Sequence, residues 1–320
     1  MLLSHLNANP DRLRAREGFV IVGLSWTVIS FFGAFPFFLS GEIPNFISAL
    51  FESVSGFSTT GATVVDCVQD LSRCILLWRS LSHWLGGMGI LIFMLAILPL
   101  RAGTTLHIFR AESSGPSVSK ITPRVQSSAS ILYLIYVAMT VIEFILLRIG
   151  GMTTFDSINY AMSTAATGGF GVHNDGVSVY GSDYINVVVT VFMFLFGLNF
   201  NAYFLILAGK PKEIFKKSEI KVYIAVVAAA VLSIAIVIRG CYHSAGESLM
   251  NSAFTVGALM TSTGFAITDY NMWPLYPKII LTLLMIMGAC AGSTCGSIKI
   301  SRVMILVKAA YANLRRLVSP

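Results

Sequence analysis

Three short segments of the chain share a central Thr-Gly step among small and hydroxylated residues. They are 58–63 (S-T-T-G-A-T), 165–170 (A-A-T-G-G-F) and 261–266 (T-S-T-G-F-A). Their central glycines, Gly61, Gly168 and Gly264, lie 107 and 96 residues apart. A pore that strips water from an alkali cation offers it uncharged carbonyl and hydroxyl oxygens, whereas carboxylates favour divalent ions. No carboxylate occurs in these segments, so we predict that they coordinate a monovalent cation.

Membrane-length apolar segments must position these loops, because the chain is 55% hydrophobic and only 12% charged over 320 residues. Each loop follows a short amphipathic stretch, too short to span a bilayer, that lies between two long apolar segments. In chain order, the long, short and long segments are 18–39, 46–57 and 75–100, then 131–149, 155–164 and 184–208, then 222–238, 248–260 and 275 onward. We therefore predict an all-α membrane protein of tandem parallel helix–pore-loop–helix repeats around a central ion pathway.

The charge distribution predicts the orientation of the chain in the membrane. The N-terminal tail and the segments 101–128, 209–221 and 299–320 carry 17 of the 22 Lys and Arg residues, whereas the loop side carries nine of the fifteen acids. By the positive-inside rule, both termini are cytoplasmic and the loops open outward. The basic residues follow topology and form no recognition element, so we expect a lipid bilayer and no nucleic acid as partner.

Several longer motifs resemble the Trk/Ktr/HKT potassium transporter superfamily, and within it the bacterial Trk-type membrane subunit. They are 51–63 (F-E-S-V-S-G-F-S-T-T-G-A-T), 78–89 (W-R-S-L-S-H-W-L-G-G-M-G), 166–170 and 288–302 (G-A-C-A-G-S-T-C-G-S-I-K-I-S-R). The resemblance implies a multi-pass protein of the bacterial cytoplasmic membrane that transports K⁺, with no bound cofactor. It also implies a pore of four units, a homodimer and a cytoplasmic nucleotide-binding regulatory subunit.

Carried onto this sequence, the resemblance assigns a filter whose backbone carbonyls hold K⁺. The filter residues are Thr59, Thr60, Gly61, Ala62, Ala166, Thr167, Gly168, Gly169, Ser262, Thr263, Gly264 and Phe265. The segment 288–297 matches the irregular stretch that gates members of the superfamily. The assigned gate residues are Gly288, Gly292, Ser293, Thr294, Gly296 and Lys299.

The residues of 288–297 support a break in the third returning helix, since glycines and hydroxyl groups weaken a helix and suit a water-lined cavity. The spacing of four between the glycines leaves open a second interpretation, a small-residue face for helix packing. Lys299 is expected at the inner end of the pathway or on the cytoplasmic surface. Gly86, Gly87 and Gly89 favour close helix packing over a hinge. Glu143 and Arg148 are expected to extend their charges toward the membrane surface, with an ion-relay role for Glu143 as the alternative. Cys67 and Cys74 are close enough in sequence to pair.

The predicted organisation has three repeats, and the family's fourth is missing. The predicted divisions are a cytoplasmic tail (1–17), repeat 1 (18–101), a linker (102–128), repeat 2 (129–208), a linker (209–221), repeat 3 (222–312) and the start of a further linker (313–320). We therefore expect a truncated gene product, an incomplete gene model or one part of a split gene. Three functions follow: the pore-forming subunit of a K⁺ uptake system, a Na⁺-conducting or Na⁺-coupled relative, and a non-conducting assembly subunit. No catalytic constellation appears in the membrane segments, so we expect no enzyme.

Overall fold

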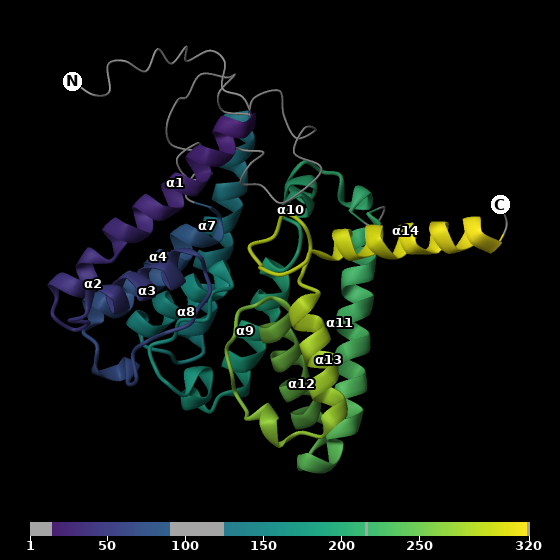
Figure 1. The fold of residues 1–320 in the computed structure, drawn as a ribbon. Helices are drawn as coiled ribbons and strands as arrows, with labels where there is room; N and C mark the ends of the chain where they lie inside the picture. Colours follow the sequence, from purple (N-terminus) through teal and green to yellow (C-terminus); the bar gives the residue numbers. More distant parts are fainter. Residues whose placement is uncertain (1–14, 90–124, 215–216, 319–320) are drawn as a thin grey trace.

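The computed structural model describes residues 15–89, 125–214 and 217–318, and these residues are helical apart from turns, loops and one isolated β-bridge between Met287 and Ile298. This arrangement confirms the all-α class (Figure 1). The predicted linker 102–128 lies almost wholly outside the described residues, as do most of the N-terminal tail and the second half of the first returning segment, 90–101.

Repeat 1 contains two outer helices that enclose a short inner one. The outgoing helix is α1 (Ala15–Gly33), continued by α2 (Phe35–Leu39). The short helix α3 (Phe46–Phe57) leads into the first loop, and α4 (Arg73–Gly87) returns after a 3₁₀ turn at Val68–Asp70. Asn45 starts α3 by accepting the N–H of Ile47, which satisfies one of the donors that every helix leaves free at its beginning.

Repeat 2 has the same order of elements. Its helices are α7 (Val125–Ile149), the short α8 (Thr154–Ala166), and the returning pair α9 (Asp183–Phe196) and α10 (Phe200–Leu207), with a 3₁₀ turn at Gly176–Tyr180. The sequence predicted one helix over 184–208, and this was wrong: the chain bends by 90° between α9 and α10. Asn199 caps the new helix through the N–H of Asn201, so the second half restarts in another direction.

Repeat 3 contains α11 (Ser218–Val237), the short α12 (Ala245–Met260), α13 (Leu275–Ile286) and α14 (Ile300–Val318). Its 3₁₀ turns are Ile238–Cys241 and Tyr270–Met272, and a further one, Pro211–Glu213, precedes α11. The segment between α13 and α14 is not helical. In Figure 1, α14 runs crosswise to α11 instead of continuing α13.

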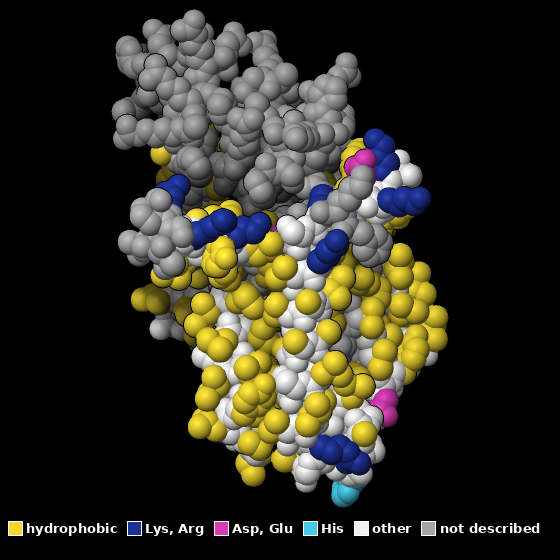
Figure 2. Space-filling view, turned by 90° about the vertical axis from the view of Figure 1, so that its right-hand side faces the viewer, with side chains coloured by type: hydrophobic (Ala, Val, Ile, Leu, Met, Phe, Trp, Pro, Cys, Tyr) yellow, Lys and Arg dark blue, Asp and Glu magenta, His cyan; other side chains and the backbone are white. Residues whose placement is uncertain are grey.

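Three stretches of the described chain are helical, long and apolar enough to cross a membrane: Val20–Leu39, Ser130–Ile149 and Ser218–Cys241. The bent pair α9 and α10 adds a fourth if it counts as one span. Figure 2 shows a broad hydrophobic band, with most of the visible Lys and Arg above it and a smaller group below. This surface is typical of a membrane protein.

The short helices form the interior of the fold. Helix α8 packs against α4, α7 and α9, and α12 packs against α9, α11 and α13. Most of α8 is buried, including polar residues such as Asn159 and Ser163. Glu143 of α7 is also fully buried in this packing, so its predicted extension toward the membrane surface was wrong. Its position on the face of α7 that carries Tyr136 and Thr140 turns it toward α8.

Candidate functional site: three equivalent loops and a broken helix

The three Thr-Gly loops adopt one backbone conformation at the ends of the three short helices. Each starts with a non-glycine residue in the left-handed region: Thr59 with φ 55°, Thr167 with φ 54° and Ser262 with φ 58°. L-residues rarely adopt this conformation, which costs about 1–2 kcal/mol. Its occurrence at three matching positions shows that the loops are copies of one structure and not chance turns.

Two residues further on, each loop has a glycine in the left-handed region: Gly61 with φ 77°, Gly169 with φ 84° and Gly264 with φ 75°. The conformation therefore matches Gly169, and not Gly168, with Gly61 and Gly264. In this register Ala166 is the last residue of α8, and the second loop begins at Thr167. The two adjacent glycines of T-G-G left the sequence alignment free to slip by one residue.

Hydroxyl groups of the short helices support the far side of the first two loops. Ser55 of α3 donates to the carbonyl of Ala62 at 2.5 Å, and Ser163 of α8 donates to the carbonyl of Phe170 at 2.6 Å. The matching residue of α12 is Ala258, which has no hydroxyl. In the third loop, the hydroxyls of Thr261 and Thr263 instead lie 2.7 Å apart. The helices and loops thus form single hydrogen-bonded units.

The loops lie directly against one another in sequence order. A Cβ added to Gly61 would lie 2.0 Å from the carbonyl oxygen of Gly168, and a Cβ added to Gly169 would lie 2.0 Å from that of Thr263. Only glycine fits such a contact. A Cβ on Gly264 would meet no described atom within 4 Å. The same contact therefore occurs twice, between loops 1 and 2 and between loops 2 and 3. The equivalent side of loop 3, at Gly264, is not covered by any described atom.

The chemistry available at the loops consists of main-chain oxygens and the negative ends of helices. The short helices α3, α8 and α12 end at the loops, so their partial negative charges of about half an electron lie beside them. No Asp or Glu belongs to the three loop cores. In the described part of the chain, no group of three or more His, Cys, Asp or Glu is placed to hold a metal ion. Such a site can hold a cation through carbonyl and helix dipoles, without carboxylates.

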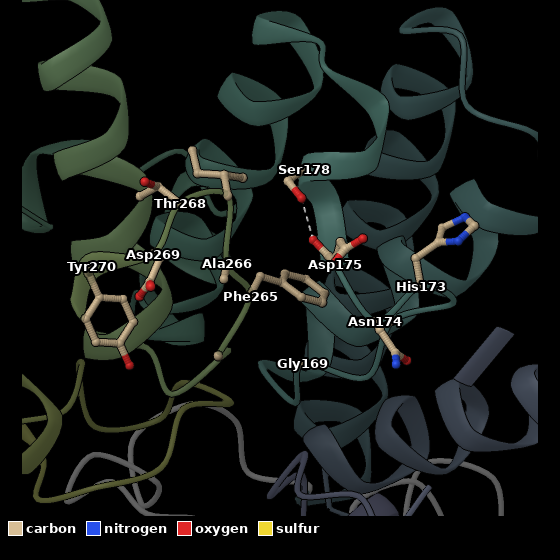
Figure 3. Close-up of a pocket in the computed structure, with 14 residues that line it drawn as sticks. Gly169, His173, Asn174, Asp175, Ser178, Phe265, Ala266, Thr268, Asp269 and Tyr270 are labelled. Carbon is tan, nitrogen blue, oxygen red and sulfur yellow. Dashed lines mark hydrogen bonds between the residues drawn. The ribbon is translucent and has the colours of Figure 1, made fainter. Parts of the chain in front are cut away.

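A pocket of about 490 Å³ opens outside the second and third loops. Its lining includes Gly169 and Gly264 of the loops together with Asp175 and Asp269. Figure 3 shows the ring of Phe265 pointing across this pocket toward the segment of Asp175, whose carbonyl accepts the hydroxyl of Ser178 at 2.6 Å. The pocket is thus an acidic space in front of the loops.

The segment 288–299 leaves the helical path and folds back on the end of α13. The N–H of Gly288 donates to the carbonyl of Ile298 at 2.9 Å, and the N–H of Ile298 donates to that of Ile286 at 3.1 Å. Because these residues form no helix, the interpretation of their glycines as one helical packing face was wrong. A Cβ on Gly288 would lie 2.5 Å from the carbonyl of Gly296, so this fold depends on small residues.

The break in repeat 2 holds this segment in place, a role that the sequence analysis missed. The N–H of Cys290 donates to the carbonyl of Gly197 at 3.1 Å, and the N–H of Phe200 donates to that of Gly292 at 2.9 Å. From the other sides, Glu219 accepts the N–H of Ala291 at 2.6 Å, and Ser262 accepts that of Gly296 at 3.1 Å. The segment is therefore hydrogen-bonded directly to the third loop.

The predicted gate residues lie in or beside this segment. Ser293 donates to the carbonyl of Cys290, whereas the hydroxyl of Thr294 is buried without a partner. Lys299 is only 5% exposed, and its Nζ donates to the carbonyl of Cys295. The side chain of Lys299 is therefore not exposed on the surface of the protein.

Two smaller expectations are also settled. The close-packing interpretation is confirmed for Gly86 and Gly87, because a Cβ would lie 2.0 Å from the carbonyl of Phe57 at the first position and 2.6 Å from the Cα of Ala166 at the second. Gly89 lies beyond the end of α4 in the left-handed region, with φ 77°. Cys67 and Cys74 do not pair, and both thiols are free.

These features define a class of protein: an all-α membrane protein in which short helices bring three loops of equivalent conformation together. Residues 2–320 match the family TrkH, described as cation transport protein, and the chain belongs to this family. The family is one of transporters, so the expectation that the chain is no enzyme is confirmed.

Similar proteins include the Trk system potassium uptake protein TrkH of Salmonella typhimurium, 37% identical over 96% of this chain and 65% of that protein. TrkH of Escherichia coli K12 is 36% identical over the same shares. The crystal structure of the potassium transporter TrkH from Vibrio parahaemolyticus superimposes with a TM-score of 0.84 at 32% identity, covering 97% of this chain and 64% of that one. The chain thus spans about two thirds of the length of these relatives.

Proposed function

We propose that this chain supplies three of the pore loops of a K⁺ uptake system in a bacterial cytoplasmic membrane. The observation that supports this most is the repeated loop-to-loop contact, from Gly61 to Gly168 and from Gly169 to Thr263. Equivalent backbones that meet in this way surround a common axis with oxygens. The names of the relatives, which are potassium uptake proteins, favour K⁺ as the ion.

The proposed filter follows the backbone register. It comprises Thr59 to Ala62, Thr167 to Phe170 and Ser262 to Phe265, so the second set moves by one residue from the sequence-based assignment. Carbonyl oxygens of these residues replace the water around the ion, and the ends of the short helices add negative potential. The acidic pocket outside the loops concentrates cations at the mouth.

The segment 288–299 is proposed as the gate on the cytoplasmic side of the filter. The hydrogen bond to Ser262 joins it to the third filter loop, and the contacts to Gly197 and Glu219 hold it from the other sides. Lys299, the last residue of this segment, places a positive charge there. This charge opposes the passage of K⁺ unless the Lys299 side chain moves away. The orientation proposed from charge, with cytoplasmic termini and outward loops, is consistent with this order.

We also propose that a fourth helix–loop–helix unit completes the ring at the open side of Gly264. In this proposal, the remainder of a longer polypeptide or a separate chain supplies that unit, and a homodimer and a cytoplasmic nucleotide-binding subunit complete the system. Two alternatives follow from the loops. Their composition also suits Na⁺, because selectivity depends on dimensions that residue types fix poorly. As the second alternative, the uncovered side of the third loop at Gly264 suits an assembly subunit that does not conduct ions.

Growth of a bacterium that lacks its own K⁺ uptake systems tests the proposal. The strain receives either this chain or a pore-complete form, in which the part of the Vibrio parahaemolyticus relative beyond the matched region supplies the proposed fourth unit. We expect the pore-complete form to restore growth at low K⁺ and to carry K⁺ into proteoliposomes more readily than Na⁺. Rescue by neither form contradicts transport, and flux that favours Na⁺ supports the Na⁺ alternative.

A further inference from the structure

A buried ion pair lies between the first two loops. Nε of Arg79 in α4 donates to Oε1 of Glu52 in α3 at 2.7 Å, and the side chains are 2% and 0% exposed. Glu52 lies seven residues before the left-handed residue of its loop, and Arg79 lies six residues after the first residue of α4. The residues at the same two positions in the other repeats carry no charge. These residues are Tyr160 and Val189 in repeat 2, and Thr255 and Leu281 in repeat 3. The pair is thus specific to repeat 1, and the symmetry of the fold does not require it.

The carboxylate of Glu52 holds the outer end of the first loop. Thr63, which directly follows the filter residue Ala62, donates its hydroxyl to Oε1 at 2.9 Å and lies 3.1 Å from Oε2. The N–H of Val64 donates to Oε2 at 3.1 Å. Both carboxylate oxygens are therefore occupied, and they fix the position at which loop 1 leaves the filter.

The guanidinium of Arg79 reaches the outer end of the second loop. One of its terminal nitrogens donates to the carbonyl of Gly171 at 3.4 Å. Its carbon Cζ lies 4.1 Å from the centre of the Phe170 ring, within the range of a cation–π contact. Gly171 directly follows the proposed filter, and Phe170 is its last residue. The ion pair therefore spans from the exit of loop 1 to the exit of loop 2.

His83, one turn further along α4, completes the contact with Phe170. Its ring stacks on the Phe170 ring with centres 3.9 Å apart, and its Nδ1 lies 3.2 Å from the hydroxyl of Ser163. Two groups at these distances cannot share one face of a ring, so Phe170 lies between His83 and Arg79. Ser163 itself supports the carbonyl of Phe170. Helix α4 thus contacts the second loop through the guanidinium group of Arg79 and the imidazole ring of His83.

We propose that Glu52 and Arg79 are positioning residues that hold loops 1 and 2 at a fixed separation and thereby set the preference for K⁺ over Na⁺. This inference rests on the proposed function of the loops as a cation filter. Na⁺ is smaller than K⁺ and needs oxygens that move closer. A brace between the two loop exits resists that movement, whereas its loss lets the loops approach each other and accommodate Na⁺.

The chemistry of the pair suits positioning better than stability. Replacing a buried ion pair with apolar residues is often neutral for folding, so stability alone does not explain its presence. A carboxylate accepts hydrogen bonds from several directions, and the guanidinium fork donates to more than one acceptor while its face meets an aromatic ring. Together, Glu52 and Arg79 contact Thr63, Val64, Phe170 and Gly171 at once.

The test is a double substitution, Glu52→Gln with Arg79→Met, in the pore-complete form. Removing both charges avoids the isolated buried charge that either single change leaves behind. We expect the double variant to melt near the wild-type temperature in detergent, while its K⁺/Na⁺ flux ratio in proteoliposomes falls about tenfold, equivalent to about 1.4 kcal/mol. A stable double variant with the wild-type flux ratio overturns the proposal, because it assigns the pair a structural role only.

Two further variants keep the test decisive. Phe170→Leu removes the ring that Arg79 and His83 hold but no charge. If the double variant does not fold, a lowered flux ratio in Phe170→Leu supports the brace and an unchanged ratio overturns it.

Arg73→Gln is the control, because it removes an exposed charge from the same helix, α4. We expect it to leave the flux ratio unchanged; an equal loss of selectivity in this control contradicts the proposal. Failure of the wild-type form to carry K⁺ would instead refute the proposed function.

Discussion

At the scale of single residues, the loops are determined by backbone conformation more than by side-chain chemistry. Thr59, Thr167 and Ser262 adopt a strained left-handed conformation, and the glycine two residues later adopts a left-handed conformation without strain. In each loop, a residue with negative φ lies between two left-handed residues. This alternation turns the successive carbonyl groups toward one side of the loop. This strain persists because the short helices and the neighbouring loops hold it from both sides, as is typical of functional sites.

The glycines of the loops allow a direct prediction at this scale. Gly61→Ala and Gly169→Ala place a methyl group 2.0 Å from a neighbouring carbonyl oxygen, so we expect K⁺ flux of the pore-complete form to fall. A barrier higher by about 1.4 kcal/mol lowers the flux about tenfold. Gly264→Ala adds only the left-handed strain unless a fourth unit packs there. Equal loss in all three variants therefore supports a fourth unit at Gly264, and wild-type flux in Gly61→Ala contradicts the loop contact.

Ser262 provides a second prediction, because its hydroxyl joins the third loop to the segment 288–299. Ser262→Ala removes the hydrogen bond from the N–H of Gly296, which is worth about 1 kcal/mol or a factor of about five in an equilibrium. We expect a higher open fraction in single-channel recordings. Ser233→Ala, which removes a hydroxyl bonded within α11, serves as the control. An unchanged open fraction in Ser262→Ala would remove this residue from gating.

Sequence patterns predicted the loops well but could not determine their register or the ion pair. The Thr-Gly steps signal a turn, and the length of the preceding stretches excludes a full span. The two glycines at 168–169 are interchangeable as letters, so only the conformation separates them. Glu52 and Arg79 are the charges of otherwise mostly apolar stretches, and that contrast was the available signal for a buried pair. Their distance in the fold depends on helix packing that sequence spacing does not contain.

At the scale of elements, two broken helices support each other. The segment after α13 was predictable because three glycines and several hydroxyls interrupt an apolar stretch. The break between α9 and α10 was missed because 184–208 contains a single glycine, Gly197, in a strongly apolar run. Asn199 was the remaining signal, since Asn is a frequent helix-starting residue. The two breaks exchange main-chain hydrogen bonds, which satisfy some of the backbone groups that each broken helix leaves free.

Glu219 connects the segment after α13 to the first turn of α11, and its removal tests that connection. Glu219→Ala deprives the N–H of Ala291 of its acceptor at 2.6 Å. Loss of a partner for a buried donor costs about 1–3 kcal/mol, so we expect faster amide hydrogen exchange across 288–299. Glu213→Ala, on the exposed turn before α11, is the matched control. Protection of the segment equal to wild type in Glu219→Ala would show that other contacts hold it.

At the scale of the whole molecule, the three loops contact one another in sequence order, and the matching contact at Gly264 is not made by any described atom. Composition and helix length indicate the membrane class, and the repeated order of elements favours the parallel arrangement that we propose. Contacts between loops distant in sequence arise only when the repeats pack, which is why the sequence predicts the loops but not their mutual contacts. The orientation still rests on charge distribution, because the fold has the same shape either way up.

Thiol labelling tests that orientation. Cys74 and Cys241 are exposed and Cys67 is partly exposed, all on the predicted outer side, whereas Cys290 and Cys295 are buried. A membrane-impermeant maleimide added to intact spheroplasts is expected to label the outer cysteines and to leave the triple variant Cys67→Ser, Cys74→Ser and Cys241→Ser unlabelled. Labelling that appears only after the membrane is permeabilised reverses the orientation and the direction of the proposed gate.

The most direct test of the central claim is the position of a heavy K⁺ substitute in a crystal of the pore-complete form. Anomalous scattering from Tl⁺ or Rb⁺ locates the ion without reference to the protein. We predict a peak on the axis shared by the three loops, within coordination distance of main-chain oxygens of 59–62, 167–170 and 262–265. A peak bound to carboxylates away from the loops, or an axis without ion at saturating Tl⁺, would contradict the account.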